Sequence, residues 1–451
     1  MKRIILILLG KLTKQIIKKH RPFIIGVTGT VGKTTATNFV YDFLRTLHGD
    51  RVYMSPQNYN GEFGIPMTIL QTKSPYSNPF LWIWVFIKGI YILLFKRSYP
   101  GYLVLEYGID HVGEMAFCVD IAPPDIAIIL NISKNHVVSF PVFRDYIEEK
   151  LTLARAAKRV IYNRDDKFIP AGIERLTGKE IVSYGIKNKD GDIYANNIKA
   201  ELDDLSFSLV QGEESYEMHY PLIGEFQVYN ILPVFALGIS LGMDIQSIRE
   251  RLTDIHPQKG RGSILKGVRE SVIIDGSYNG GFNSISGGIE YMDGLSSEYN
   301  KILFLGDMRE LGEDSKELHT EIAEKIITSS VQTVVLVGEE MKRFVYPLLL
   351  EAWGSMPEEV PEGTVPELTS NRVFSLLHSR LAGKKVRDII MSASEEAKTV
   401  VFTKGSQSSI YLEEGIKEFL YDLRDVEKLC RQSDHWMRIK NHFFESVIAE
   451  I

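Results

Sequence analysis

A short apolar run that leads directly into a glycine-containing turn places the strongest constraint on how this chain can fold. Phe23–Val27 has the composition of a buried strand, Thr28–Thr35 (TGTVGKTT) follows it, and a helical pattern then covers about residues 33–47. The glycines allow the backbone to curl until successive N–H groups point at one anion, and the helix adds its positive end. In such a loop Lys33 can reach phosphate oxygens, and the Thr34 hydroxyl can ligate Mg²⁺. The residues that we expect to bind nucleotide here are Thr28, Gly29, Thr30, Val31, Gly32, Lys33, Thr34 and Thr35.

The size and charge of the chain exclude some classes of protein. Its 451 residues are enough for two or three domains of ordinary size. The formal net charge of −6 provides no overall basic field of the kind that favours nucleic-acid binding. The two cysteines, Cys118 and Cys430, lie far apart in the sequence, so we expect free thiols in a reducing compartment.

Strand-like runs alternate with helical patterns along the chain, which predicts an α/β fold with mostly parallel sheets. Residues 186–220 instead contain short alternating runs, which predict a small antiparallel β element. Pro257, Gly260 and Gly262 cluster near a predicted domain boundary. We therefore predict a P-loop ATPase domain over residues 21–257 and a Rossmann-like α/β domain over residues 258–451. The strands predicted in these two domains are Phe23–Val27, Tyr102–Glu106, Asp125–Asn131, Arg159–Tyr162, Ser271–Asp275, Lys301–Gly306, Thr333–Gly338 and Thr399–Thr403.

Two apolar segments leave alternatives open. Residues 1–20 combine a short apolar run with many lysines, and we expect a basic amphipathic helix. Residues 76–100 form an apolar insertion whose centre, Phe80–Phe95, is marginal for a transmembrane helix of about 20 residues. Either segment fits peripheral contact with a membrane, with Trp82 and Trp84 near the headgroups, and either fits packing against protein.

The phosphate loop resembles that of the Mur ligases. The general Walker pattern fails at Val27, where it requires glycine, whereas the T-G-T-x-G-K-T/S variant of the Mur ligases matches. Ser55–Pro66 (SPQNYNGEFGIP) and Glu106–Glu114 (EYGIDHVGE) resemble segments of the branch that adds D-alanyl-D-alanine to a muramoyl tripeptide. In the second half, Gly306–Gly312 (GDMRELG) matches the same branch, and the resemblance covers about residues 22–425.

The resemblance also implies a metal site. Glu106 ends a predicted strand, where ligand sites form in α/β sheets, and its carboxylate can hold Mg²⁺ beside the phosphates. His136 matches a metal-site histidine of the family, and Lys150 matches a lysine that is carbamylated in Mur ligases. A carbamate is an anionic oxygen donor, so two Mg²⁺ ions are expected; the alternative for Lys150 is a solvated helix lysine. The implied metal-binding residues are Thr34, Glu106, His136 and Lys150, and the implied catalytic residues are Lys33, His136 and Lys150.

Other matches carry substitutions. Asn230 is kept as a nucleotide contact in GEFQVYN, although Phe226 and Gln227 replace the histidine and asparagine of the family motif. Arg261 and Asp275 are the implied nucleotide contacts of the second domain. Within that domain glycine replaces the second aspartate of the family's D-D-S-Y-N motif, and glutamine replaces the arginine of K-G-S-R. These departures are Gly276 and Gln407, and the implied substrate contacts are Asn58, Asn60, Ser277, Tyr278, Asn279 and Lys404.

The implied activity is ATP-dependent, ADP-forming amide ligation in peptidoglycan precursor synthesis. The expected substrates are UDP-N-acetylmuramoyl tripeptide and D-alanyl-D-alanine, the expected cofactors are ATP and Mg²⁺, and a cytoplasmic monomer is expected, with the inner membrane face as a further location. Mur ligases typically grip the uridine nucleotide with an N-terminal domain, but only 28 residues precede Gly29. Two alternatives therefore stay open: a Mur-like ligase for a different, for example lipid-linked, carboxylate, and a membrane-associated nucleotide-binding scaffold.

Overall fold

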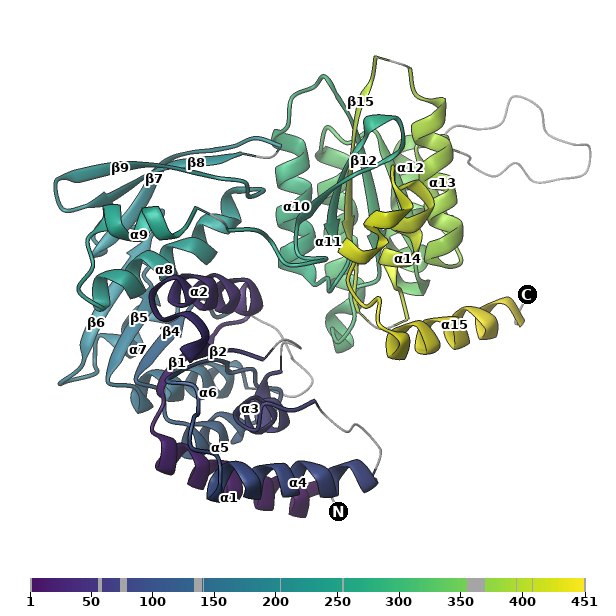
Figure 1. Cartoon of the computed structure of the whole chain (residues 1–451). Helices are drawn as coiled ribbons and strands as arrows, with labels where there is room; N and C mark the ends of the chain where they lie inside the picture. Colours follow the sequence, from purple (N-terminus) through teal and green to yellow (C-terminus); the bar gives the residue numbers. More distant parts are fainter. Residues whose placement is uncertain are drawn as a thin grey trace, which may run out of the picture. The chain divides into compact units, whose positions relative to one another are not determined.

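The computed structural model describes residues 2–55, 59–73, 79–133, 140, 142–202, 204–253, 255–354, 370–394, 396–407 and 409–449. The chain forms two compact units (Figure 1). The first contains residues 1–199, 204–221 and 225–255, and the second contains residues 200–203, 222–224 and 256–451.

The first unit is built on a nine-stranded sheet with the order β2-β3-β1-β4-β5-β6-β7-β8-β9. Neighbouring strands from β2 to β7 pair in parallel, and β8 and β9 form an antiparallel hairpin. The central strands are almost continuous runs of buried aliphatic residues, as expected of strands that are covered on both faces. The strands are β1 (Phe23–Thr28), β2 (Val52–Tyr53), β3 (Tyr102–Glu106), β4 (Ile126–Ile129), β5 (Arg159–Asn163), β6 (Glu180–Gly185), β7 (Ile193–Ala200), β8 (Leu205–Gln211) and β9 (Glu214–Tyr220).

Helices cover both faces of this sheet. The helices of the first unit are α1 (Lys2–His20), α2 (Lys33–His48), α3 (Gly61–Ile69), α4 (Pro79–Leu94), α5 (Glu114–Ile121), α6 (Phe143–Ala156), α7 (Pro170–Ile173), α8 (Val228–Ser240) and α9 (Ile245–Arg251). Helices α2 and α8 pack together on one face. On the other face α5 and α6 share one hydrophobic core with α1, α3 and α4. Among the described residues, no helix is long and apolar enough to cross a bilayer.

The second unit has a six-stranded sheet with the order β10-β11-β15-β12-β13-β14. Only the pairing of β10 with β11 is antiparallel among the pairs described. One hydrophobic core lies beneath α10, α11 and α12, and a second lies beneath α13 and α14. The elements are β10 (Ser263–Lys266), β11 (Val272–Gly276), α10 (Phe282–Gly294), β12 (Tyr299–Gly306), α11 (Ser315–Thr328), β13 (Thr333–Val337), α12 (Tyr346–Trp353), β14 (Val373–Leu376), α13 (Ser379–Ser392), β15 (Lys398–Lys404), α14 (Leu412–Ile416) and α15 (Asp434–Ala449).

The predicted fold class is confirmed, and every predicted strand is present with ends shifted by at most two residues. The prediction of a small antiparallel element within residues 186–220 is confirmed by β8 and β9, which pair in antiparallel fashion from Leu205 to Gln211. Strand β7 pairs in parallel with β6, so the main sheet extends into this segment.

Candidate functional site

The phosphate loop of the first unit connects β1 to α2 and has little room for side chains at its glycines. A Cβ atom on Gly29 would lie 2.9 Å from the Cβ of Leu130. Gly32 has φ +84°, in the left-handed region that favours glycine, and a Cβ atom there would lie 2.3 Å from Oδ1 of Asn230. Helix α2 begins immediately afterwards with Lys33 and the buried Thr34. The first N–H groups of a helix have no partner within the helix, so the start of α2 is suited to binding an anion.

Asn131 holds the loop in this conformation. Its Oδ1 accepts hydrogen bonds from the backbone N–H groups of Thr30 (3.1 Å) and Val31 (2.8 Å), and its Nδ2 donates to the Val31 carbonyl (2.7 Å). Ser133 adds a bond from its N–H to the Thr30 hydroxyl (3.0 Å). Asn131 was not singled out from the sequence. Its position just beyond β4, at the carboxyl end of a strand beside β1, was the available signal.

Lys33 and Lys150 converge on one carbonyl of the loop. Lys33 Nζ donates to the Gly29 carbonyl (3.1 Å) and the Thr30 carbonyl (3.1 Å), and Lys150 Nζ donates to the same Gly29 carbonyl (2.9 Å). The side chain of Lys150 is buried and lies 4.6 Å from the centre of the Tyr146 ring. The alternative of a solvated helix lysine is therefore wrong for this position.

The environment of Lys150 favours its neutral form. Burial lowers the pKa of Lys150 well below its ordinary value, and the Lys33 cation lowers it further. The carboxylates of Asp110 and Glu106 act in the opposite direction and are weaker influences. A neutral amine is nucleophilic, whereas an ammonium is not, so the lowered pKa of Lys150 favours the nucleophilic form.

Glu106 ends β3 and lies at the same edge of the sheet as the phosphate loop, because β3 pairs with β1 and Glu106 is in register with Val27. The carboxylate is largely buried, and its Oε1 accepts a hydrogen bond from Asn60 Nδ2 at 3.3 Å. A small pocket beside it is lined by Thr37, Ser55 and Tyr59, among other residues.

The residues at this edge fit a magnesium ion. Mg²⁺ is commonly held by one or two protein carboxylates together with substrate phosphates, and the Glu106 carboxylate and the Thr34 hydroxyl are oxygen donors of that kind. The described residues contain no group of three His, Cys, Asp or Glu side chains that could hold a metal ion. His136 and Asn58 lie outside the described residues.

Asn230 lies against the phosphate loop, and one substituted residue orients it. Asn230 lies in the first turn of α8, and its Nδ2 donates to Oε1 of the buried Gln227 at 2.8 Å. This bond leaves Oδ1 directed at Gly32. Phe226, the other substituted residue, is 45% exposed. Gln227 therefore supports the retained asparagine.

A second polar cluster lies in the second unit, at the carboxyl ends of β11 and β15. Asp275 is fully buried; its Oδ1 accepts from Ser277 N–H at 2.9 Å, and its Oδ2 has no hydrogen-bond partner among the described residues. Burial raises the pKa of Asp275. The guanidinium of Arg261 lies 4.2 Å from the centre of the Tyr278 ring, and Arg261 Nε is also buried and unpartnered within the described part of the chain. Buried polar atoms without partners are candidates for ligand contacts.

Lys404 ends β15 beside Asp275, because Gly276 and Lys404 are in register. Burial and, to a lesser degree, the Arg261 cation lower the pKa of Lys404 to about 8, and the Asp275 carboxylate acts in the opposite direction. A Cβ atom on Gly276 would lie 2.6 Å from the Thr403 carbonyl and 2.8 Å from Cδ of Lys404. Glycine is therefore required at position 276 while Lys404 has this conformation. Asn279 is exposed, and Gln407 is partly buried.

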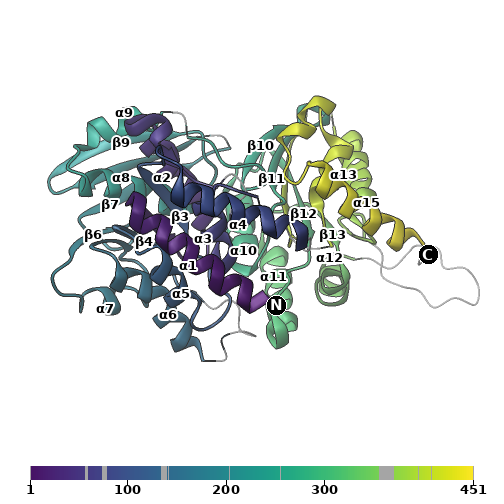
Figure 2. The same cartoon turned by 60° about the horizontal axis from the view of Figure 1, so that its bottom comes forward.

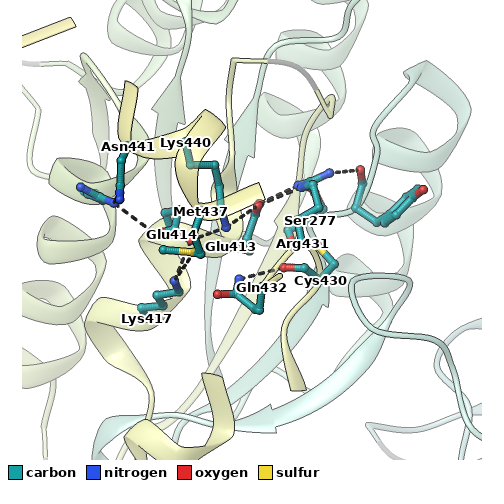
Figure 3. Close-up of polar contacts among 12 residues, drawn as sticks. Ser277, Glu413, Glu414, Lys417, Cys430, Arg431, Gln432, Met437, Lys440 and Asn441 are labelled. Carbon is teal, nitrogen blue, oxygen red and sulfur yellow. Dashed lines mark hydrogen bonds and ion pairs between the residues drawn. The ribbon is translucent and has the colours of Figure 1, made fainter. Parts of the chain in front are cut away.

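Residues near the C-terminus hold the loop that follows β11 (Figure 3). Arg431 makes a two-pronged ion pair with Glu413 of α14, with N–O distances of 2.8 and 2.6 Å. The same guanidinium donates to the backbone carbonyls of Tyr278 (2.7 Å) and Ser277 (2.8 Å). Lys440 of α15 reaches Glu413 (3.4 Å) and Glu414 (2.5 Å) from the other side. This network was not predicted from the sequence, because Arg431 and Lys440 lie beyond the region of family resemblance.

Buried polar contacts hold the segment Gly306–Gly312 (GDMRELG) in place. His319 of α11 is fully buried, its Nε2 accepts from Met308 N–H (3.2 Å), and its Nδ1 donates to the Ser315 carbonyl (2.7 Å). Asp307 accepts from Met341 N–H at 2.8 Å. These bonds fix the turn after β12 from two directions.

Comparisons with known proteins agree with the fold described above. The profile of the Mur ligase middle domain matches residues 88–238. A UDP-N-acetylmuramoyl-tripeptide–D-alanyl-D-alanine ligase of Haemophilus influenzae is 24% identical over 402 residues, which are 87% of this chain and 81% of the relative. The ligase of the same name from Borreliella burgdorferi is 27% identical, over 74% of this chain and 66% of the relative.

Solved structures show the same fold. MurF from Acinetobacter baumannii superposes with a TM-score of 0.72 at 21% identity, over 92% of this chain and 80% of that one. MurF from Thermotoga maritima in complex with ADP gives a TM-score of 0.70 at 20% identity, over 94% of this chain and 84% of that one. The chain therefore contains a match to the Mur ligase middle domain over residues 88–238 and has the fold of the Mur ligase structures.

Proposed function

We propose that the protein is an ATP-dependent ligase that joins D-alanyl-D-alanine to UDP-N-acetylmuramoyl tripeptide and releases ADP and phosphate. The observation that carries the proposal is the phosphate loop with Lys33 and Lys150 on one carbonyl and Asn230 against Gly32. The relatives named above are ligases of this type, which supports the choice of substrates.

In this reaction the substrate carboxylate attacks the γ-phosphorus of ATP, giving an acyl phosphate and ADP. The incoming amine then adds to the acyl carbon, and phosphate leaves. The N–H groups at the start of α2 and Lys33 would hold the phosphates, and Lys33 would offset negative charge on the transferring group. Mg²⁺, held by Thr34 and Glu106 with His136 as a further ligand, would supply additional positive charge at the phosphates.

We further propose that Lys150 becomes carbamylated. Its neutral Nζ would attack the carbon of CO₂, forming an N–C bond and releasing one proton, and the product is an anionic oxygen donor. The lowered pKa supports this step, because only the neutral amine has the electron pair that it requires.

The second unit would contribute the remaining contacts. Arg261 and Asp275 are proposed to contact nucleotide, and the unpartnered Arg261 Nε and Asp275 Oδ2 support this assignment. The residues that we propose for substrate contact are Asn58, Asn60, Ser277, Tyr278, Asn279 and Lys404. Ser277 and Tyr278 would act through their loop, which Arg431 holds.

A second candidate keeps the chemistry and changes the substrate to a different, lipid-linked carboxylate. The exposed apolar residues of α1 and α4, which belong to the same unit as the phosphate loop, favour this candidate. For either candidate we propose a cytoplasmic monomer.

Phosphate release by the purified protein, measured with ATP and Mg²⁺, separates the candidates. Release that requires both the UDP-linked tripeptide and D-alanyl-D-alanine supports the first. Release only with another acceptor pair supports the second. Tight ATP binding without release in the presence of any acceptor would contradict both and favour a nucleotide-binding scaffold. Lys33→Ala should abolish release, and Lys73→Ala, which changes a lysine outside the loop, is the matched control.

A further inference from the structure

Helices α1 and α4 form an exposed apolar surface that the proposed reaction does not use. The two helices lie side by side in both views of the molecule (Figures 1 and 2). They run in the same direction, because Leu12 packs at Gly89 and the last residues of α1 bond to the end of α4. A Cβ atom on Gly89 would lie 2.4 Å from Cδ2 of Leu12, so glycine allows the close approach.

One side of this helix pair is buried and the other is not. Leu9, Ile16, Val85 and Ile92 belong to the core of the first unit. The opposite face of α4 carries large apolar side chains at helical spacing, including Trp84, which is 67% exposed. The exposed apolar residues on α4 include Ile83, Trp84, Ile87, Ile90, Tyr91 and Leu94, and those on α1 include Ile4, Ile7 and Leu8. A contiguous apolar surface of this kind is unusual on a soluble protein.

Two lysines of the helix pair are bonded to backbone carbonyl groups. Lys88, the only charged residue of α4, donates its Nζ to the Gln71 carbonyl. Lys19 Nζ donates to the Leu93 carbonyl at 2.7 Å and satisfies the end of α4. The exposed face of α4 is therefore free of charge along its length.

All charged side chains on the two helices are positive, and one of them, Lys14, pairs with Asp120 of α5 at 2.5 Å. Residues 1–41 and 63–105 contain no aspartate or glutamate, although the whole chain has a net charge of −6. Exposed cations lie beside the apolar face: Arg3, Lys11 and Lys18 on α1, and Arg97 just after α4. A second copy of this surface would bring like charges together, whereas anionic lipid headgroups would complement them. Exposed tryptophan and tyrosine also suit the region between acyl chains and headgroups.

We propose that α1 and α4 together bind the surface of an anionic phospholipid bilayer, lying in its plane without crossing it. The apolar face of α4 and the N-terminal half of α1 enter the acyl boundary, and the lysines and arginines contact phosphate groups of the headgroups. This inference concerns surface binding and does not depend on which ligase substrate is correct.

Co-sedimentation of the full-length protein with lipid vesicles tests the proposal. Vesicles of phosphatidylcholine alone are compared with vesicles that also contain phosphatidylglycerol, at low and at high salt. We expect sedimentation with the anionic vesicles at low salt, weaker sedimentation at high salt, and a blue shift of tryptophan fluorescence from Trp84. The combined variant Ile83→Gln, Ile87→Gln, Ile90→Gln should lose binding by at least about tenfold. Lys11→Gln with Lys18→Gln should weaken binding to anionic vesicles by about fivefold for each lysine.

Matched controls change the same residue types elsewhere on the surface. Leu377→Gln, Met391→Gln and Leu423→Gln together replace three exposed apolar residues of the second unit, and Lys316→Gln with Lys384→Gln removes the same charge. Both controls should bind as the wild type does. The proposal is overturned if the wild type stays in the supernatant with both vesicle types, or if the α4 variant binds normally. A dimer that the α4 variant abolishes, with no vesicle binding, would instead assign the surface to a second copy.

Discussion

Lys404 shows how its surroundings give a single residue unusual chemistry. Its pKa of about 8 arises from burial and from the Arg261 cation, so neutral amine forms as the pH rises through 8, whereas the ordinary value is 10.5. We expect amine-reactive labelling of Lys404 to reach half its maximal rate near pH 8, measured by peptide mass spectrometry. Asp275→Asn removes a carboxylate that favours the ammonium form, and it should move this midpoint to lower pH. A midpoint near pH 10 in the wild type would contradict this assignment.

The proposed carbamylation of Lys150 can be tested by direct observation. With ¹³C-labelled bicarbonate we expect a carbamate carbon signal in the NMR spectrum of the wild type and its loss in Lys150→Met. Turnover should fall by on the order of 100-fold in this variant, since a charged group beside the transferring phosphate is lost. Lys158→Met, which removes an exposed lysine that pairs with Asp125, should keep both the signal and the turnover. An unchanged carbamate signal in Lys150→Met would place the modification elsewhere.

The sequence could supply the identities of site residues but not all of their partners. Lys33 was predicted from the glycine turn and Glu106 from a strand end, whereas Lys150 was predicted from its position in the family resemblance. Asn131 and Arg431 were not found, since each acts on backbone groups that are distant in sequence: Arg431 contacts Ser277 from 154 positions away. The substitution at Gly276 was visible, but its cause, the packing of Lys404, required coordinates.

At the level of elements, α15 is the clearest case of a helix held by buried charge. Glu413→Gln would remove the carboxylate that pairs with the buried cations of Arg431 and Lys440. Removing one partner of a buried ion pair lowers the free energy of unfolding by about 3–5 kcal/mol. We expect faster hydrogen–deuterium exchange throughout residues 434–449 and a lower midpoint of urea unfolding. Glu270→Gln, which breaks an exposed pair with Lys266, is the control and should change neither. Equal exchange in Glu413→Gln and the wild type would show that α15 docks through its apolar contacts alone.

Strands and long amphipathic helices were predictable because their hydrophobic period is strong. The central strands are buried on both faces and read as continuous aliphatic runs, so Ile126–Ile129 was recognised. By contrast, the edge strand β14 (Val373–Leu376) is short and only partly buried, and α15 has few buried apolar residues and depends on Lys440. Neither element was predicted from the sequence.

At the scale of the whole molecule, the two units have separate hydrophobic cores, and the predicted boundary between residues 257 and 258 lies near the last division, before His256. The chain also contributes residues 200–203 and 222–224 to the second unit, at the two ends of the segment that carries β8 and β9. The local composition does not mark these two short segments, because their assignment to the second unit depends on contacts between residues distant in sequence. Proline and glycine clusters therefore indicate only the last position at which the chain passes from one unit to the other.

Because the two units have separate cores, we expect nucleotide binding to change the thermal unfolding of one unit and not of the other. Because the phosphate loop, Lys150 and Glu106 all belong to the first unit, MgADP should stabilise that unit through binding to its folded state alone. At about 100 times the dissociation constant this amounts to about 2.7 kcal/mol, which raises the unfolding temperature of a unit of this size by roughly 5–10 °C. Differential scanning calorimetry should show this shift in the transition of the first unit. Lys33→Ala should abolish the shift while keeping the transition itself, and Lys73→Ala should leave both unchanged. An undiminished shift in Lys33→Ala would mean that the nucleotide binds away from the phosphate loop.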